Sequence, residues 1–473
     1  MQKTGKRTNI DKTTLFRDTP VPRALRVMAV PTIISQLVNL IHNMVDAFFI
    51  GRTGNAYMMA ATSITLTLVL MNVALANLFG TGGGSLMARL MGAGKPDRAK
   101  KVSAYSVYGA ILAALVYSAL VGIFNRPLLR FLGASDATFD YARSYAMVVI
   151  VMGSLPAILS MALGHLLRNA GHSGKASFGL SGGGVLNMLL DPLFMFVLLP
   201  PGNEVLGAAI ATALSNAAAC VYLLIACRRV GKESSPLSLS VRDAASIEKE
   251  DRRGIFAVGI PSAVLLALFD LANVCVNILA SGHDDLVLAG MGIVMKVERI
   301  PNAVNVGLCM GMLPIVAYNY SSGNRARMEE TIRTARKAGL LICLASMIFF
   351  EIVARPAVGI FLRTGGENNA DALRTVAYAA LFLRIRCLAS PFQFLNYHTS
   401  YGLQAMGKGR ATLLHAFVRE IVFYIPCMFL LDRLFGETGL AAALPVGEAL
   451  GAVFALWLMA RTLRKLREAQ KTA

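Results

Sequence analysis

Long apolar segments recur along the whole chain, separated by short stretches rich in charged residues, glycine or proline. A helix needs about 20 apolar residues to cross a bilayer core of about 30 Å, and these segments are of that length or longer. The pattern predicts twelve transmembrane helices, at residues 27–50, 57–87, 102–124, 143–167, 176–200, 205–227, 255–280, 286–318, 338–361, 373–404, 411–434 and 438–460. The predicted fold class is therefore an all-α polytopic membrane protein.

Composition agrees with this prediction and excludes other classes of protein. Of the 473 residues, 55% are hydrophobic and only 15% are charged, whereas soluble domains carry roughly 25% charged residues. A soluble enzyme, a disordered chain and a fibrous protein are excluded. The first 20 residues are polar and basic, so we expect no cleavable signal peptide, and the first spanning helix is expected to direct insertion. The seven cysteines lie in apolar runs and are interpreted as small buried side chains.

The basic residues predict the orientation in the membrane. Lys and Arg number 46 against 27 Asp and Glu, a net charge of +19. Most of them lie in the N-terminal tail, the C-terminal tail and every second connection between the predicted helices. Basic loops stay in the cytoplasm, so both termini are predicted to be cytoplasmic, in the cell (inner) membrane. Topology explains the positive charge, and besides membrane lipids no nucleic-acid partner is expected.

The chain divides into two similar halves. The only long polar connection runs from Arg228 to Arg253, and an offset of 230 residues pairs Pro31 with Pro261. The same offset pairs Asn43 with Asn273. We therefore expect two pseudo-symmetric six-helix lobes, a common transporter plan in which the substrate is held between the repeats. The expected boundaries are an N-terminal tail 1–26, an N-terminal lobe 27–230, a linker 231–253, a C-terminal lobe 254–461 and a C-terminal tail 462–473.

Two acidic residues lie inside predicted spans of the first half, where a charge costs at least about 2.5–3.5 kcal/mol. Asp46 lies in the first helix and Asp191 in the fifth, with Asn187 one turn before Asp191 and Thr212 in the sixth helix. Two carboxylates, an amide and a hydroxyl could share a proton or bind a hard cation such as Na+ through oxygen. These four residues are the predicted cation-coupling site. The alternative is that they only hydrogen-bond neighbouring helices together. His42, one turn before Asp46, is a candidate for tuning it.

Further polar residues are weaker candidates for substrate binding or gating. These candidates are Asn43, Asp270, Asn273, Lys296, Glu298 and Arg419. Arg384 and Arg386 are interpreted as counter-ions or gate residues, and Glu448 as a packing or network residue of the last helix. Under the repeat offset Asp46 corresponds to Val276, and near the Asn187–Asp191 pair the second half has Arg419 and Glu420, so the acid chemistry is expected only in the first half.

The sequence carries no signature of an enzyme. It lacks a phosphate-binding loop, and no nucleophile–base motif or metal-ligand spacing of histidines is present. A membrane-embedded enzyme is therefore disfavoured, and no cofactor is expected.

Several ordered segments carry a family resemblance. They are Pro31 with Asp46 and the following IGR, then LMGAGKPDRA, LLRNAGHSGKA, LNMLLDPLF, GAAIATALS, GIVMKVERI, PIVAYNYSSGN and VREIVFYIP. In this order, over residues 23–460, the chain resembles the multidrug and toxic compound extrusion (MATE) transporters. The resemblance implies two lobes in a V-shape and alternating access. Cationic or amphiphilic organic compounds would be exported in exchange for inward H+ or Na+, and we expect a monomer.

The resemblance also bears on the site. In the family branch whose cation site lies in the N-terminal lobe, the matching positions are Asp46, Asn187, Asp191 and Thr212. Another branch places acids in the seventh and tenth helices; the tenth helix here offers Arg384 and Arg386 instead. The alternative function is a flippase of the same superfamily for lipid-linked sugars or other lipids, which those two arginines and Lys296 favour.

Overall fold

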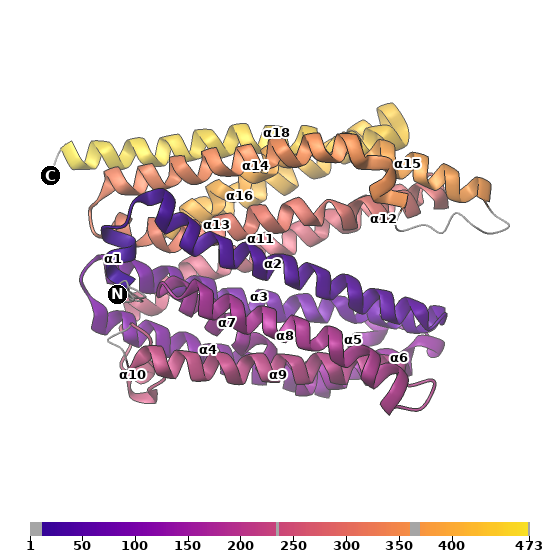
Figure 1. Cartoon of the computed structure of the whole chain (residues 1–473), viewed down its shortest axis with the longest axis horizontal. Coiled ribbons are helices and arrows are strands. Elements are labelled where there is room, and N and C mark those ends of the chain that lie inside the picture. The colour runs from indigo at the N-terminus through magenta and orange to yellow at the C-terminus, as the bar shows by residue number, and fades with distance from the viewer. Residues whose placement is uncertain (1–11, 233–235, 360–368, 472–473) are drawn as a thin grey trace, which may run out of the picture.

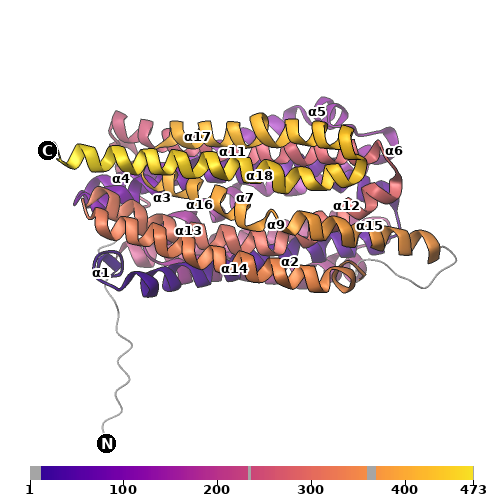
Figure 2. The same ribbon diagram turned by 90° about the horizontal axis from the view of Figure 1, so that it is seen from above.

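The computed structural model describes residues 12–232, 236–359 and 369–471, and every regular element in these ranges is a helix. Parts of the expected tails and linker, residues 1–11, 233–235 and 472–473, lie outside the described residues, as does the end of the predicted ninth span. The helices run along the long axis of the molecule (Figure 1). Helix α1 (Lys12–Arg17) and the last turns of α18 (Ile425–Lys471) lie at the same end in both ribbon views (Figures 1 and 2).

The N-terminal half forms one bundle, the lower one in Figure 1. Its helices are α2 (Val21–Arg52), α3 (Ala56–Gly92), α4 (Pro96–Ile123), α5 (Asn125–Phe131), α6 (Asp136–Ala146), α7 (Ser154–Asn169), α8 (Ser173–Leu193) and α9 (Glu204–Gly231). Two π-helical turns, η1 (Met147–Met152) and η2 (Phe194–Leu198), join α6 to α7 and extend α8. Helices α6 and α7 bend by 50° where they meet, so together they cover the predicted fourth span.

The C-terminal half forms the second bundle. After the short α10 (Val241–Ala245) come α11 (Lys249–Ser281), α12 (Asp285–Val297), α13 (Arg299–Ser321), α14 (Arg325–Gly359), α15 (Asn369–Cys387), α16 (Ser390–Ala405), α17 (Gly409–Phe417), the π-helical turn η3 (Val418–Tyr424) and α18. Helices α15 and α16 bend by 48° and act as one span.

The final helical stretch reverses direction at Gly436, whose backbone angles, φ 60° and ψ −144°, are not helical. The glycines beyond it pack back on the residues before it: Gly439 against Leu431, and Gly447 against Tyr424. The 60 residues from Gly409 to Glu468 therefore cover two spans. With the other described helices this gives the twelve spans expected from hydropathy.

Helix ends differ from the prediction because hydropathy marks only the apolar part of a helix. Helix α14 begins at Arg325, well before the predicted residue 338. Its first turns carry charged side chains, so the hydropathy pattern did not include them. Helix α2 begins at Val21, and within the expected N-terminal tail Leu15 and Phe16 of α1 are buried. They pack with residues of α13 and α14, so this part of the chain contacts the C-terminal bundle.

The two bundles meet closely at the end that holds the described termini. Helix α3 packs on α11, and α2 on α13. A Cβ on Gly311 of α13 would lie 2.5 Å from the Cα of Ala29, so only glycine allows this approach. Ser85 donates to the backbone oxygen of Gln404 at 2.6 Å, and Arg98 pairs with Asp251 at 2.7 Å. The lobes are thus closed against each other in this half of the molecule.

Candidate functional site

The four residues of the predicted cation-coupling site come together in the N-terminal bundle. Asp46 lies on α2, Asn187 and Asp191 on α8, and Thr212 on α9. Asn187 and Asp191 are fully buried. Residues four apart on a helix project from the same face, which explains why both side chains of α8 reach the same point.

The amide of Asn187 connects this group. Its Nδ2 donates to Asp191 Oδ1 at 3.2 Å and to the Thr212 hydroxyl at 3.3 Å, so it links α8 to α9. Asp46 and Asp191 interact electrostatically where α2 packs on α8. Two carboxyl groups on different helices thus lie in one cluster.

The cluster contains buried oxygen atoms that take part in no hydrogen bond. Asp46 Oδ1, Asn187 Oδ1 and Asp191 Oδ2 are buried and have no hydrogen-bond partner within the described residues. A buried polar atom without a partner costs about 1–3 kcal/mol, more when it is charged. Oxygens of this kind suit a bound proton or a hard cation. Across the described residues no group of three or more His, Cys, Asp or Glu gathers as a metal site.

Two neighbouring side chains extend the cluster. His42 lies against Asn187 and interacts with it, and its Nδ1 has no hydrogen-bond partner among the described residues. Tyr145 of α6 is buried and interacts electrostatically with both Asp46 and Asp191. The position of His42, one turn before Asp46, is what makes it a candidate in the sequence. Tyr145 is one of 13 tyrosines in the chain, and nothing in the sequence distinguishes it from the others.

The backbone around Asp191 is irregular. Pro192 follows it directly, and the π-helical turn η2 begins two residues later. Proline removes a backbone donor, and single π-helical turns are frequent at functional sites. Asp191 therefore sits where α8 stops being a regular α-helix.

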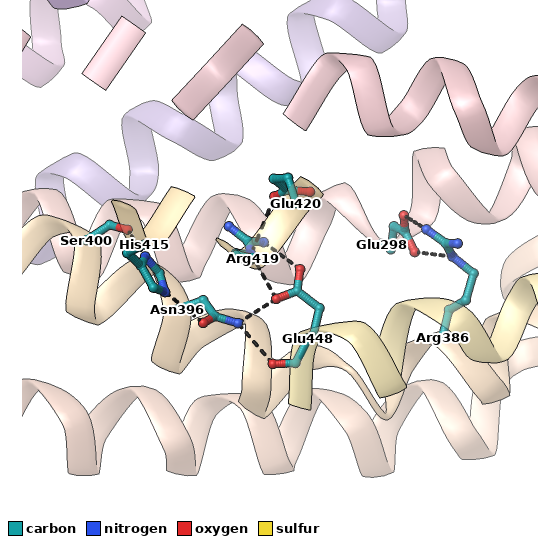
Figure 3. Close-up of polar contacts among 8 residues, drawn as sticks. All are labelled: Glu298, Arg386, Asn396, Ser400, His415, Arg419, Glu420 and Glu448. Atoms are coloured by element: carbon teal, nitrogen blue, oxygen red, sulfur yellow. Dashed lines mark hydrogen bonds and ion pairs between the residues drawn. The ribbon is translucent and has the colours of Figure 1, made fainter. Parts of the chain in front are cut away.

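The C-terminal bundle contains a different arrangement, in which buried acids are paired with arginines (Figure 3). Arg419 of η3 binds Glu448 of α18 through two hydrogen bonds, 2.5 and 3.0 Å long. Glu420 lies 3.5 Å from Arg419. Asn396 donates to Glu448 at 2.6 Å. All four residues are buried.

The hydrogen bonds of this network fix its direction. Because Asn396 uses Nδ2 to donate to Glu448, its Oδ1 is the acceptor for His415 Nε2, 3.1 Å away. His415 Nδ1 then lies 2.9 Å from the Ser400 hydroxyl. In the neutral ring a donating Nε2 leaves Nδ1 as an acceptor, so Ser400 donates to it. The chain is a structural network that joins α16, α17, η3 and α18.

The remaining candidates are distributed over the C-terminal bundle and α2. Glu298 accepts two hydrogen bonds from Arg386, 2.7 and 2.8 Å long, so Arg386 acts as a counter-ion. Lys296 is exposed near the end of α12. On α11, Asp270 interacts with Arg299, and Asn273 is partly buried one turn further on.

Asn43 does not join the N-terminal cluster. It is exposed, and its Nδ2 donates to the Asn39 backbone oxygen of its own helix at 2.9 Å.

The second half also buries two acids, Glu420 and Glu448. Both lie against Arg419, so the expectation of acid chemistry only in the first half stays a prediction. Under the repeat, Glu420 falls near the position of Asp191, with Arg419 directly beside it. The interpretation of Glu448 as a network residue agrees with its contacts.

The sequence profile of the MatE family matches residues 31–198 and 261–430, which is more than half of the chain. The chain belongs to the MatE family. The two matched segments begin at Pro31 and Pro261, the pair that defines the repeat. The MatE membership agrees with the resemblance seen in the sequence.

Curated relatives and solved structures extend the MatE assignment. The multidrug export protein MepA of Staphylococcus aureus (strain MRSA252) is 28% identical over 444 residues, 94% of each chain. A structure described as the outward-facing conformation of a multidrug resistance MATE family transporter of the MOP superfamily has a TM-score of 0.89 at 21% identity. The similarity covers 97% of this chain and 99% of the other. These relatives are transporters and not enzymes.

A third protein has the same fold and a different description. A MOP superfamily transporter from Pyrococcus furiosus has a TM-score of 0.87 at 21% identity, over 97% and 99% of the two chains. Its description says that reverse polarity of the binding pocket suggests a different function. At this identity the likeness concerns the fold alone.

Proposed function

We propose that this MatE protein is a secondary active multidrug efflux transporter that exports cationic or amphiphilic organic compounds in exchange for H+ or Na+. The observation that carries the coupling site is the group of three buried oxygens without hydrogen-bond partners among the described residues, on Asp46, Asn187 and Asp191. The hydroxyl of Thr212 completes the site as a fourth oxygen. The names of the curated relatives support export of drugs as the activity.

The coupling follows from charge. With no cation bound, Asp46 and Asp191 place two negative charges in an apolar bundle, which attracts a cationic substrate and is itself unfavourable. A proton or Na+ entering the cluster neutralises part of this charge, so the cationic substrate is held less tightly and leaves. Each charge moving down a membrane potential of about 100 mV supplies about 2.3 kcal/mol, which supports roughly fifty-fold accumulation.

The lobes would provide alternating access. In this proposal the N-terminal lobe (27–230) rocks against the C-terminal lobe (254–461), with the linker 231–253 between them. The contacts between Gly311 and Ala29 and between Ser85 and Gln404 separate when the opposite state forms. The protein is proposed to lie in the cell membrane with both termini in the cytoplasm, which the basic residues of its tails and alternate loops support. One chain holds both lobes and the cluster, so the functional unit is proposed to be a monomer.

The test uses the purified protein in liposomes. An imposed pH gradient and, separately, an imposed Na+ gradient are applied, and uptake of a fluorescent lipophilic cation is followed. We expect one gradient to drive uptake, and Asp46→Asn to abolish it. The matched control is Asp140→Asn, an exposed aspartate of α6. Full gradient-driven uptake by Asp46→Asn would contradict the assignment of the site.

The flippase alternative receives less support from the charges. Arg386 is one of the cationic residues that favoured a flippase, and its guanidinium group forms an ion pair with Glu298. Movement of a fluorescent lipid between leaflets, in the absence of drug transport, would favour the flippase.

A further inference from the structure

A pocket lies between the first turns of α14 and the last turns of α18, at the end of the molecule that holds the described termini. It has a volume of about 250 Å³. An adjoining pocket of about 490 Å³ shares Glu329, Arg333 and Arg467 with it. Neither pocket touches the N-terminal cluster or the network around Arg419, so the transport mechanism makes no use of them.

The walls of the first pocket divide into an apolar and a basic part. Ile332, Leu456 and Met459 contribute apolar surface. Leu456 is also exposed on the outside of the bundle, so the pocket opens toward the surface that faces lipid. The basic part consists of four arginines from the two helices, Arg333, Arg336, Arg464 and Arg467.

Positive charge in the pocket exceeds negative charge. Glu329 is the one carboxylate in the described lining, and it pairs with Arg333 at 2.9 Å and with Arg467 at 2.5 Å. Arg464 pairs with Glu468 of its own helix, and both side chains are largely exposed. Exposed ion pairs are weak and rearrange at little cost. Guanidinium groups can donate two parallel hydrogen bonds to a phosphate.

The position of Trp457 indicates the level of this pocket relative to the membrane surface. Trp457 is the only tryptophan of the chain, and the guanidinium of Arg461 lies 5.3 Å from its ring centroid. Tryptophans with a polar neighbour concentrate at the membrane–water interface. On α18 the exposed apolar positions Val453 and Leu456 come just before it. Arg464 lies seven residues beyond Trp457, about 10 Å along the helix. The arginines therefore lie at the level of lipid headgroups.

We propose that this pocket binds an anionic phospholipid of the adjacent leaflet. The phosphate is held by Arg333, Arg336, Arg464 and Arg467, and an acyl chain runs along the exposed apolar surface that begins at Leu456. A zwitterionic lipid offers the same phosphate but adds a cationic group, which the excess positive charge repels. Basic pockets between transmembrane helices are known to recognise anionic headgroups on this physical basis. The bound lipid bridges α14 and α18, two helices of the C-terminal bundle.

The single tryptophan supplies the test, because its fluorescence is quenched by bromine atoms on nearby acyl chains. The full-length protein is reconstituted in mixed vesicles of phosphatidylglycerol and phosphatidylcholine, with bromine on one lipid or on the other. We expect brominated phosphatidylglycerol to quench Trp457 more strongly than brominated phosphatidylcholine at the same mole fraction. Equal quenching by the two lipids would overturn the proposal.

A pair of variants separates the pocket from general surface charge. In Arg333→Gln with Arg464→Gln, two exposed side chains of the pocket are changed, and the relative affinity for phosphatidylglycerol is expected to fall about tenfold or more. The matched control is Arg228→Gln with Arg229→Gln, which removes two exposed arginines from the end of α9. A preference that survives in the pocket variant, or disappears in the control, would contradict a site at this pocket.

Inorganic phosphate distinguishes a lipid from a soluble anion. If the pocket takes lipid, added phosphate should leave the quenching preference unchanged when compared with sodium chloride at the same ionic strength. A loss of the preference specific to phosphate would assign the pocket to free phosphate and overturn the lipid proposal.

Discussion

Arg419 and Glu448 form a two-point ion pair across a helical hairpin, with hydrogen bonds of 2.5 and 3.0 Å, and both side chains are almost fully buried. The pair is possible because the chain reverses at Gly436 and brings α18 back against η3. Arg419 also stacks 4.8 Å from the centroid of the Tyr397 ring. Charge, hydrogen bonding and packing at this point depend on each other.

Replacing Glu448 with alanine is expected to destabilise the protein strongly. The change leaves the Arg419 guanidinium buried without its main partner, which costs about 3–5 kcal/mol. Unfolding of the detergent-purified protein by denaturant measures the effect. The double change Arg419→Met with Glu448→Leu should recover a large part of the loss. If the single variant were as stable as the native chain, the pair would have no structural role.

Replacing Asn187 with leucine tests the N-terminal cluster directly. The variant removes the amide that joins Asp191 to Thr212 and one of the three unpaired oxygens. The concentration of coupling ion that gives half-maximal export is expected to rise about tenfold, as when a supporting group of a cation site is lost. Asn43→Leu, an exposed asparagine of α2, serves as the control and should leave this concentration unchanged. Equal effects of both changes would argue against the site.

Replacing Gly311 with alanine should interfere with the closed contact between the lobes. The added Cβ would lie 2.5 Å from the Ala29 backbone, and relieving such a contact costs about 1–3 kcal/mol. We expect a lower unfolding temperature and slower export. Gly174→Ala is the matched change, because no atom lies within 4 Å of its added Cβ. A Gly311→Ala protein that exports at the native rate would show that this contact is not rate-determining.

Replacing Arg98 with glutamine should weaken the connection between α4 and α11. Asp251 is buried and receives hydrogen bonds of 2.7 and 2.9 Å from this arginine. Its carboxylate would lose these partners, at a cost of about 1–3 kcal/mol in the free energy of unfolding. Lys100→Gln is the comparison, since its pair with Asp97 is exposed and 3.9 Å long. Its expected cost is under about 1 kcal/mol. Similar values for both variants would contradict a specific role for Arg98.

The sequence predicted the number of spans because hydropathy measures the property that places a helix in a bilayer. The ends of the helices were harder, since charged first turns such as those after Arg325 are helical without being apolar. The bend before α7 also has no hydropathy signal, because the residues directly on either side of it, Met147–Met152 and the first turns of α7, are both largely apolar. A helix boundary depends on backbone hydrogen bonds, which an average over side chains does not measure.

The site was predictable to the extent that its residues are unusual. An aspartate inside an apolar span is conspicuous, and Asp46 and Asp191 were found in this way. Tyr145 was missed because a tyrosine in such a span is common, and only the fold brings it to the two acids. The pairing of Glu448 with Arg419 had no sequence signal, because the two residues are 29 positions apart and only the reversal at Gly436 brings them together. Pairing of this kind is a property of three-dimensional contact.

The reversal at Gly436 also has a consequence for membrane insertion. The turn is short and carries the polar residues Asp432, Arg433 and Glu437, so the two final spans are held close together from the start. Gly439 lies against Leu431 and Gly447 against Tyr424. We therefore expect the last span to insert against the one before it, where Arg419 and Glu448 neutralise each other in the apolar interior.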